Sequence, residues 1–330
     1  GKLPIDVVTR AMAPIASAAP DADPALVGRR RARFVVDGGR LSYSARDSHE
    51  RVRVSDCAAL HPALRRALLR VATVGVGFLR DGLALRLACD ERGRVSAALE
   101  GGTAREIELL VSWAVCDGAI ALDDVDEHEI ARAGDPLLLG EITAGAVPAA
   151  ASDAGVFAQA TRFGGDAILR EVMRAVTEVS GGVANRNVLE LFAGAGHLTL
   201  PLLLAGACVD AVEGSARAVE YLNKNIAALD EPVRKRALVR RRFIDHALPI
   251  ESVPKVVVAD PPRTGIPELA GLMKRLAPAR LVMVSCDVAT GARDLAIAMA
   301  HGYALDRLLP INAFPRTSHV EWVATLVRAP

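Results

Sequence analysis

The second half of the chain alternates between short apolar runs and segments with helical periodicity. Runs such as Val188 to Leu191 and Leu281 to Ser285 are rich in β-branched residues and leucine and are typical of buried strands. Between them, segments such as Phe163 to Val179 and Ala289 to Ala300 repeat apolar residues at helical spacing. This alternation predicts an α/β domain with a doubly wound sheet over residues 156–330.

The first half has a different pattern, in which short strands alternate with tight turns. Arg31 to Val54 and Gly82 to Leu99 each predict hairpin strands. His61 to Ala72 is expected to be helical, Glu106 to Val115 fits either a strand or a helix, and Val156 to Ala160 is expected to be a strand. The first 28 residues are rich in Pro, Ala and Asp and are expected to be irregular. We therefore predict a smaller β-rich (α+β) domain over residues 1–155.

Composition narrows the class of protein. A chain of 330 residues can form two domains with substantial cores. Its five cysteines are scattered without C-x-x-C spacing, so neither a disulfide framework nor a metal site is expected. The longest apolar region, Val188 to Val212, is interrupted by Glu190, His197 and Asp210, which argues against a membrane span. No signal sequence is visible, so we expect a cytoplasmic protein, and nothing demands more than a monomer.

The formal net charge is only +1, but arginine is clustered along the chain. One cluster is Arg29 to Arg33, and another extends from Arg234 to Arg242. Such clusters are dense enough to contact phosphates, and a solvated protein surface is the alternative explanation for each.

A glycine-rich turn indicates a nucleotide-type ligand. Ala193 to Gly196 follows a predicted strand, and the next predicted strand, Cys208 to Val212, ends at the carboxylate of Glu213. In open α/β sheets such glycines let the backbone approach a ligand, and the acid binds ribose hydroxyls. The third glycine of a dinucleotide fingerprint is absent. An adenosine-containing ligand of another kind is therefore implied, with simple packing of the glycines as the alternative.

Three further strand ends carry reactive side chains. Asp260 ends a buried run and begins a proline-stiffened turn that includes Arg263. Cys286 lies between a predicted strand and a predicted helix, whose N-terminus is expected to lower the pKa of the thiol. His319 and Glu321 are two apart, so they share one face of a strand. The alternative explanations are a rigid turn, a small buried cysteine and exposed strand charges.

Together these segments resemble the S-adenosylmethionine (SAM)-dependent RNA uracil-C5 methyltransferases that act on 23S ribosomal RNA or on tRNA. The resemblance extends from about Arg29 to the end of the chain. Its motifs are F-A-Q from Phe157, L-F-A-G-A-G-H-L-T-L from Leu191, V-E-G from Val212, D-P-P-R-T-G from Asp260, V-S-C-D from Val284 and F-P-R-T-S-H-V-E from Phe314. It implies a class I (Rossmann-like) SAM methyltransferase domain preceded by the β-rich domain.

The resemblance also implies roles for individual residues. C5 of uracil is too weakly nucleophilic to take a methyl group until a thiolate has added to C6, and a base must later remove the C5 proton. Cys286 matches the nucleophile, Glu321 the base, and Asp260 a hydrogen-bonding group where methyl donor and uracil meet. The positions that match the SAM-binding residues of the family are Gln159, Phe192, Gly194, Gly196, His197, Glu213, Asp245 and Asp260.

The sequence departs from the family pattern at several points. His197 and Thr161 stand where asparagine is usual. Cys57 matches the fourth ligand of the [4Fe-4S] cluster that many members bind, but the three upstream cysteines have no counterpart, so no iron-sulfur cluster is expected in this chain. The small amino-terminal RNA-binding barrel of the family also has no counterpart, so the chain is expected to lack its amino-terminal part.

The expected partner is RNA, and ribosomal RNA is favoured because the Cys57 segment resembles the cluster-bearing ribosomal branch. A tRNA uracil-C5 methyltransferase, a SAM-dependent N-methyltransferase and a non-catalytic RNA-binding paralogue are the alternatives. An N-methyltransferase does not need Cys286, and its D-P-P motif carries an aromatic residue where this chain has Arg263.

Overall fold

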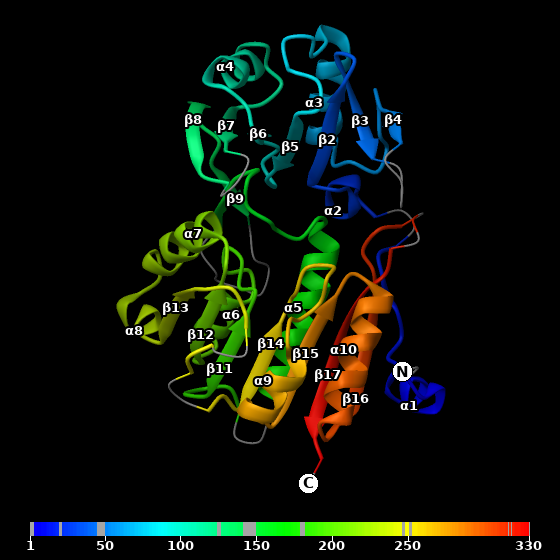
Figure 1. Ribbon diagram of the computed structural model, residues 1–330, viewed down its shortest axis with the longest axis vertical. Helices are drawn as coiled ribbons and strands as arrows, with labels where there is room; N and C mark the ends of the chain where they lie inside the picture. The colour runs from blue at the N-terminus through cyan, green and yellow to red at the C-terminus, as the bar shows by residue number, and fades with distance from the viewer. Residues whose placement is uncertain are drawn as a thin grey trace. The chain divides into compact units, whose positions relative to one another are not determined.

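The computed structural model describes residues 3–19, 22–44, 50–123, 127–140, 150–178, 182–245, 248–250, 253–315, 317 and 319–329. The chain forms two compact units (Figure 1). Unit 1 comprises Gly1–Pro20, Ile142–Pro148 and Phe163–Pro330, and unit 2 comprises Asp21–Glu141 and Ala149–Arg162.

Unit 1 contains an eight-stranded sheet in the order β1-β16-β17-β15-β14-β11-β12-β13. The central strands β11 to β15 are parallel, whereas β17 runs antiparallel to both β15 and β16. The strands are β1 (Ala16–Ser17), β11 (Asn187–Leu191), β12 (Cys208–Glu213), β13 (Ala237–Arg241), β14 (Val256–Ala259), β15 (Arg280–Ser285), β16 (Tyr303–Asn312) and β17 (Glu321–Arg328). From β11 the chain builds outward to β13 and then returns to β14 on the other side. This reversal of strand order between β11 and β14 is where open α/β sheets bind ligands.

Helices cover this sheet, and α9 and α10 lie side by side (Figure 1). The helices are α1 (Ile5–Ala11), α5 (Arg162–Thr177), α6 (Thr199–Leu204), α7 (Ala216–Ala227), α8 (Glu231–Arg234), α9 (Leu269–Leu276) and α10 (Val288–Ala300). Leu272 and Leu295 from α9 and α10 share a buried cluster with Val257 and Met283 of the sheet. The predicted α/β sheet is confirmed. The expectation that the first 28 residues are irregular was wrong, because they contain α1, β1 and the short helix α2 (Pro24–Val27). Ala11 of α1 joins this buried cluster.

Unit 2 contains a seven-stranded sheet in the order β4-β3-β2-β5-β6-β7-β8. Its strands are β2 (Arg31–Asp37), β3 (Arg40–Ser44), β4 (Arg51–Arg53), β5 (Ala84–Cys89), β6 (Val95–Glu100), β7 (Gly118–Leu122) and β8 (Glu129–Gly134). The other elements are α2 (Pro24–Val27), α3 (Pro62–Val74), α4 (Ala104–Ser112) and the short pair β9 (Leu138–Gly140) and β10 (Ala150–Ser152). The predicted hairpins and the helix after His61 are confirmed, so a β-rich region precedes the Rossmann-like part.

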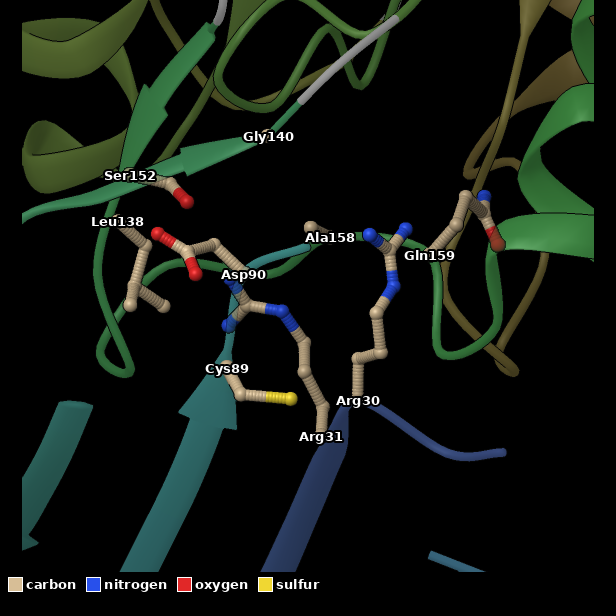
Figure 2. A pocket seen from close by; sticks show the side chains of 9 residues that line it. All are labelled: Arg30, Arg31, Cys89, Asp90, Leu138, Gly140, Ser152, Ala158 and Gln159. Carbon is tan, nitrogen blue, oxygen red and sulfur yellow. The ribbon is translucent and has the colours of Figure 1, made fainter. Parts of the chain in front are cut away.

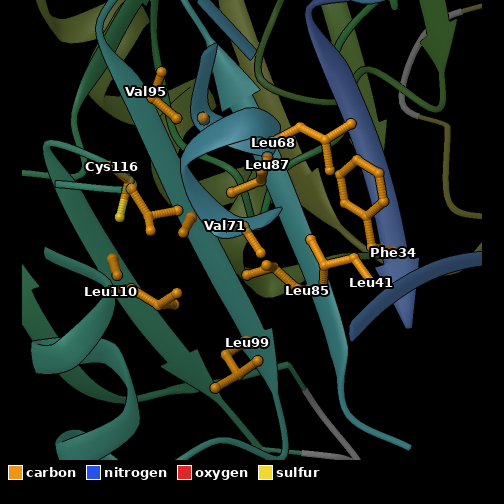
Figure 3. Close-up of a cluster of buried hydrophobic side chains, with 14 of the residues drawn as sticks. Phe34, Leu41, Leu68, Val71, Leu85, Leu87, Val95, Leu99, Leu110 and Cys116 are labelled. Carbon is orange, nitrogen blue, oxygen red and sulfur yellow. The ribbon is translucent and has the colours of Figure 1, made fainter. Parts of the chain in front are cut away.

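The core of unit 2 forms between its sheet and its helices (Figure 3). Leu64, Leu68 and Val71 recur along one face of α3 and are buried against sheet residues such as Phe34 and Leu85. Spacings of three and four residues place these side chains on one helical face, and their burial stabilises the unit by about 1.5–3 kcal/mol for each large side chain.

Two segments of unit 2 depended on more than periodicity. Residues 104–112 are helical because Thr103 and Glu106 form a reciprocal capping box, which decides the ambiguous stretch in favour of a helix. The strand predicted at Val156 to Ala160 was wrong. The carbonyl of Val156 accepts from the Arg31 side chain and that of Ala160 from the Arg30 N–H, so neither joins a strand ladder.

Within the described part of the chain, no helix is long and apolar enough to cross a bilayer. The same residues contain no group of three or more His, Cys, Asp or Glu side chains arranged to hold a metal ion.

Candidate active site

Most of the predicted site residues lie at one edge of the unit 1 sheet. The glycine-rich turn, Glu213, Asp260 and Cys286 follow the carboxyl ends of the parallel strands β11, β12, β14 and β15. Because β17 is antiparallel to β15, its first residue, Glu321, lies at this same edge. The strand order reverses at the centre of this edge, between β11 and β14.

The two glycines of the turn serve different purposes. Both have positive φ, 57° at Gly194 and 101° at Gly196. A Cβ on Gly196 would lie 2.9 Å from the Leu222 side chain of α7, so this glycine is needed for packing. A Cβ on Gly194 would meet no atom within 4 Å, so the backbone there is open to a ligand. The Asn225 amide donates to the Ala195 carbonyl at 2.9 Å and ties the turn to α7.

Glu213 is fixed beside this turn. Its carboxylate accepts hydrogen bonds from the backbone N–H groups of Gly194 at 2.9 Å and Ser215 at 2.8 Å. Phe192, which leads into the turn, has a positive φ of 62°, a conformation that non-glycine residues rarely adopt. Each carboxylate oxygen has further lone pairs, so Glu213 can also accept from ligand hydroxyl groups.

His197 and Asp245 lie farther from the strand ends. The Nε2 atom of His197 is 3.2 Å from the Gly165 carbonyl at the start of α5, which requires a proton on that nitrogen for a hydrogen bond. The Asp245 carboxylate lies 3.8 Å from the Arg242 guanidinium. Asp245 is in the loop that follows β13.

Gln159 belongs to unit 2, where it borders a cavity of about 50 Å³ (Figure 2). Figure 2 shows the guanidinium groups of Arg30 and Arg31 directed into this cavity. The remaining lining residues are Cys89, Asp90, Leu138, Gly140, Ser152 and Ala158. The contact of Gln159 with a cofactor stays a prediction.

Cys286 and Glu321 are brought together by strand register. Ser285 at the end of β15 pairs with Trp322 of β17. Cys286 follows Ser285 and Glu321 precedes Trp322, so Cys286 and Glu321 are neighbours. The charges of Glu321 and Asp260 both act on the Cys286 thiol. Three reactive groups from distant parts of the sequence therefore share one small region.

The surroundings of Glu321 favour the protonated form of its carboxyl group. It is only 7% exposed, and its Oε2 atom is buried with no hydrogen-bond partner among the described residues. Burial, followed by the negative charge of Asp260, raises the pKa of Glu321 to about 7. A carboxyl group with this pKa can accept and release a proton near neutral pH.

The expectation of a lowered thiol pKa at Cys286 was wrong. Partial burial and the charges of Glu321 and Asp260 raise the pKa of this thiol, and only Arg263 opposes them. Helix α10 begins two residues later, at Val288, and Asp287 caps it by accepting from the Thr290 N–H at 2.8 Å. The carboxylate of Asp287, rather than the sulfur of Cys286, therefore occupies the position at the helix N-terminus that favours negative charge.

Sequence reasoning missed Glu190 as a site residue. Its side chain is 2% exposed within β11, and the Thr199 hydroxyl donates to its carboxylate at 2.7 Å. Burial, with the charges of Asp260 and Glu213, raises the pKa of Glu190 to about 8. A glutamate inside an apolar strand was the available signal, since buried carboxyl groups are rare.

Several arginines of the two clusters are engaged within the protein. Arg31 donates to the carbonyls of Asp153 and Val156, and Arg33 makes a bidentate pair with Glu100 at 2.8 and 3.1 Å. In the second cluster, Arg240 donates to Asp210 at 2.8 Å and Arg236 to the Leu203 carbonyl at 2.8 Å. Dense arginine in the sequence therefore overstates the charge available to phosphates.

Comparisons with known proteins place the chain among RNA methyltransferases. No family model matches it. It is 32% identical over 317 residues to an uncharacterized RNA methyltransferase of Rhizobium meliloti, covering 90% of this chain and 71% of that relative. It is 36% identical over 180 residues to a 23S rRNA uracil-C5 methyltransferase of Acidithiobacillus ferrooxidans, covering 52% of this chain and 39% of that enzyme.

The fold comparison points the same way. The crystal structure of a tRNA (uracil-54, C5)-methyltransferase of Pyrococcus abyssi, in complex with S-adenosyl-L-homocysteine, has a TM-score of 0.68. The match covers 92% of this chain and 76% of that one at 18% identity, so it supports the fold. Against two other curated RNA methyltransferases, the chain spans only 34% and 37% of the relative's length. On the extent of the Rhizobium match, and on the sequence motifs, the chain belongs to the family of RNA methyltransferases that includes the 23S rRNA uracil-C5 enzymes.

Proposed function

We propose that the protein methylates C5 of a uracil in RNA, with SAM as the methyl donor. The observation that carries this proposal is the meeting of Cys286, Glu321 and Asp260 at the sheet edge. A thiol beside a carboxyl group of near-neutral pKa supplies both groups that the C5 reaction needs, a nucleophile and a base. Neither group is required for methyl transfer to an exocyclic amine.

The residues where the strand order reverses, between β11 and β14, are of the kinds that can bind SAM. The open backbone at Gly194 allows close approach, and Glu213 is oriented to accept from ribose hydroxyls. The charges of Asp260 and Glu213 both act on the buried Glu190, so two carboxylates bring negative charge to the region where the strands end. Such a site favours a cationic ligand, and the sulfonium group of SAM supplies both that charge and a transferable methyl group. We assign Phe192, Gly196, His197 and Asp245 to the same ligand from the family motifs.

In the first part of the reaction, the thiolate of Cys286 forms a bond to C6 of the uracil. The C5=C6 electron pair moves toward C5 and O4, and Asp260 is positioned to hydrogen-bond in this region. C5 then forms a bond to the methyl carbon, and the bond between that carbon and sulfur breaks, which leaves a neutral thioether. The two new bonds are S–C6 and C5–CH₃.

In the second part, the carboxylate of Glu321 takes the remaining proton from C5. The electrons of that C–H bond re-form the C5=C6 bond, and the C6–S bond breaks to return the thiolate. The buried, unpartnered Oε2 atom and the raised pKa of Glu321 support this assignment. The product is 5-methyluracil, and one proton is released.

We propose ribosomal RNA as the substrate, because the named relatives include 23S rRNA methyltransferases. C5 and C6 are inaccessible inside a stacked helix, so the target uridine must be flipped out or presented in a loop.

The test uses RNA in which uracil carries tritium at C5, incubated with the protein and SAM. We expect SAM-dependent release of tritium into water, and its loss in Cys286→Ala. Separate incubations with ribosomal RNA and tRNA from cells identify the substrate class. Methyl groups entering RNA without tritium release would exclude C5 chemistry. SAM binding with no transfer to either RNA would favour a non-catalytic RNA-binding protein.

A further inference from the structure

We propose that unit 2 binds the phosphate backbone of RNA through one face of its sheet, with Arg40 of β3 and Arg51 and Arg53 of β4 as the contacts. The inference rests on the proposed function for the identity of the partner, and it adds the surface that the partner occupies. None of the three arginines belongs to the residues assigned to catalysis or to SAM.

The two faces of the unit 2 sheet differ in character. Residues such as Phe34 of β2 and Leu41 of β3 are buried in the core that α3 and α4 cover (Figure 3). Side chains alternate between the two faces along a strand, and directly paired residues of neighbouring strands share a face. The arginines that share the face opposite this core are Arg31 and Arg33 of β2, Arg40 of β3, Arg51 and Arg53 of β4 and Arg86 of β5. Strand register therefore gathers arginines from four strands onto one face.

On the inner strands β2 and β5, arginine charge is largely neutralised within the protein. Arg33 donates to both carboxylate oxygens of Glu100, at 2.8 and 3.1 Å. Arg86 forms ion pairs with Glu100 and Glu127. These pairs leave little charge for an outside partner at this part of the face.

The edge of the same face carries charge that is more available. β4 is the outermost strand of the sheet, and β3 lies next to it. The two strands contain three arginines and no acidic residue, and all three arginines are exposed. Within the described part of the chain, no ion pair involves Arg40, Arg51 or Arg53. Asp37 is paired in register with Arg40, so the greater share of available charge lies on β4.

The arginines of β4 are spread along the strand. Arg51 and Arg53 are two residues apart, so their side chains leave the same face roughly 7 Å from each other. Arg51 donates to the hydroxyl of Ser44 on β3. The Nη2 atom of Arg53 would lie 3.7 Å from a Cβ added at Gly38, so this guanidinium group extends toward the turn that precedes Arg40. The edge thus presents a line of positive charge rather than a single point.

A nucleic acid backbone has the chemistry that matches this surface. Guanidinium groups bind phosphates with two parallel hydrogen bonds, and phosphates follow one another along a strand. Exposed hydroxyl groups such as that of Ser44 also contact phosphates. Phosphate contacts carry no sequence information, so this face contributes affinity and orientation to RNA binding but does not select the target uridine.

The test measures RNA binding by the full chain at several salt concentrations. Fluorescence anisotropy gives the affinity for a ribosomal RNA fragment between about 50 and 200 mM salt. Replacing both Arg51 and Arg53 by Gln is expected to lower the magnitude of the slope of log K against log salt by about 1.4, which is about 0.7 for each phosphate no longer bound. Arg51→Lys with Arg53→Lys keeps both charges and should retain most of the slope. Arg66→Gln with Arg105→Gln removes two exposed arginines from α3 and α4, on the other side of the sheet, and is the matched control.

An unchanged slope in the folded double glutamine variant of Arg51 and Arg53 would overturn the proposal, and so would an equal change in the control pair. Circular dichroism checks the fold of each variant. If the double variant fails to fold, Arg40→Gln takes its place, and its slope should decrease in magnitude by about 0.7.

Tritium release from C5-labelled RNA separates this inference from the proposed function. If the slope changes as expected but the wild-type protein releases no tritium with SAM, the RNA-binding face stands and the proposed chemistry fails. If tritium is released while the slope is the same in wild type and in the glutamine variants, the proposed function stands and the assignment of this face is wrong. Wild-type protein that binds no RNA would overturn both.

Discussion

Glu190 is the residue whose burial has the clearest consequence for stability. The folded protein keeps its proton up to about pH 8, whereas an exposed glutamate loses it near pH 4.5. Between these values the folded state binds more protons than the unfolded chain, so the free energy of unfolding must fall as pH rises. Glutamine cannot ionise, and its carbonyl oxygen can still accept from Thr199.

We therefore expect Glu190→Gln to change the pH dependence of stability. The free energy of unfolding of the variant, relative to wild type, should rise by roughly 3 kcal/mol at most between pH 5 and pH 8. Urea denaturation at several pH values measures this difference. Glu108→Gln is the control, because it makes the same substitution at a glutamate that is exposed on α4. Parallel curves for wild type and Glu190→Gln would mean that Glu190 is ionised in the folded protein.

At the scale of elements, α10 packs closely beside the site because residue 291 is a glycine and has no side chain. A Cβ at this position would lie 2.0 Å from the Trp322 ring and 2.8 Å from the Ser285 hydroxyl. These two residues are the neighbours of Glu321 and Cys286 in sequence. The close approach of α10 to β15 and β17 thus sets the spacing of the two groups assigned to catalysis.

Gly291→Ala tests this packing. In an exposed helix, alanine would stabilise by up to about 1 kcal/mol relative to glycine, but here the overlap should destabilise by about 1–3 kcal/mol. Tritium release should fall as well, because the helix must move away from β17. Gly77→Ala, where an added Cβ meets nothing within 4 Å, should change stability by no more than about 0.5 kcal/mol. A Gly291→Ala protein as stable as wild type would show that the helix accommodates the methyl group.

The sequence was most informative about elements whose pattern is local. Hydrophobic periodicity located β11, β15 and α5, because the spacing of apolar residues is contained within each segment. The pattern from Glu106 fits a helix or a strand, and the capping box makes it a helix. The pattern from Val156 to Ala160 fits a strand, but its carbonyls accept hydrogen bonds from Arg30 and Arg31 instead of a neighbouring strand. Those outcomes depend on partners outside the segment, which periodicity does not contain.

For the molecule as a whole, the motifs predicted which side chains gather, but their electrostatics came from tertiary structure. Motif order alone predicted that Cys286, Glu321 and Asp260 belong together. The raised pKa of the thiol follows from the partial burial of Cys286 and from the register of β15 with β17, which makes Glu321 its neighbour. The raised pKa of Glu190 was not predicted, because burial of one side chain in a strand depends on both faces of the sheet being covered.

Under the proposed function, charge on the protein surface contributes to RNA binding. Arg33 already makes two hydrogen bonds to Glu100, so little of its charge is available to a phosphate. Arg241 is exposed and pairs in register with Glu213, at the sheet edge where the site residues gather. If RNA binds at this edge, as proposed, Arg241 is expected to contact it, and each phosphate contact contributes to salt dependence.

We expect Arg241→Gln to weaken RNA binding and Arg33→Gln to leave it nearly unchanged. The slope of log K against log salt should decrease in magnitude by about 0.7 for each phosphate of a single strand that the variant no longer binds. Fluorescence anisotropy with a ribosomal RNA fragment between about 50 and 200 mM salt measures this slope for wild type and both variants. Equal slopes in wild type and Arg241→Gln would place the RNA elsewhere. A larger change of this slope in Arg33→Gln would mean that RNA displaces Glu100 from Arg33. Arginines in intramolecular ion pairs would then also bind phosphates.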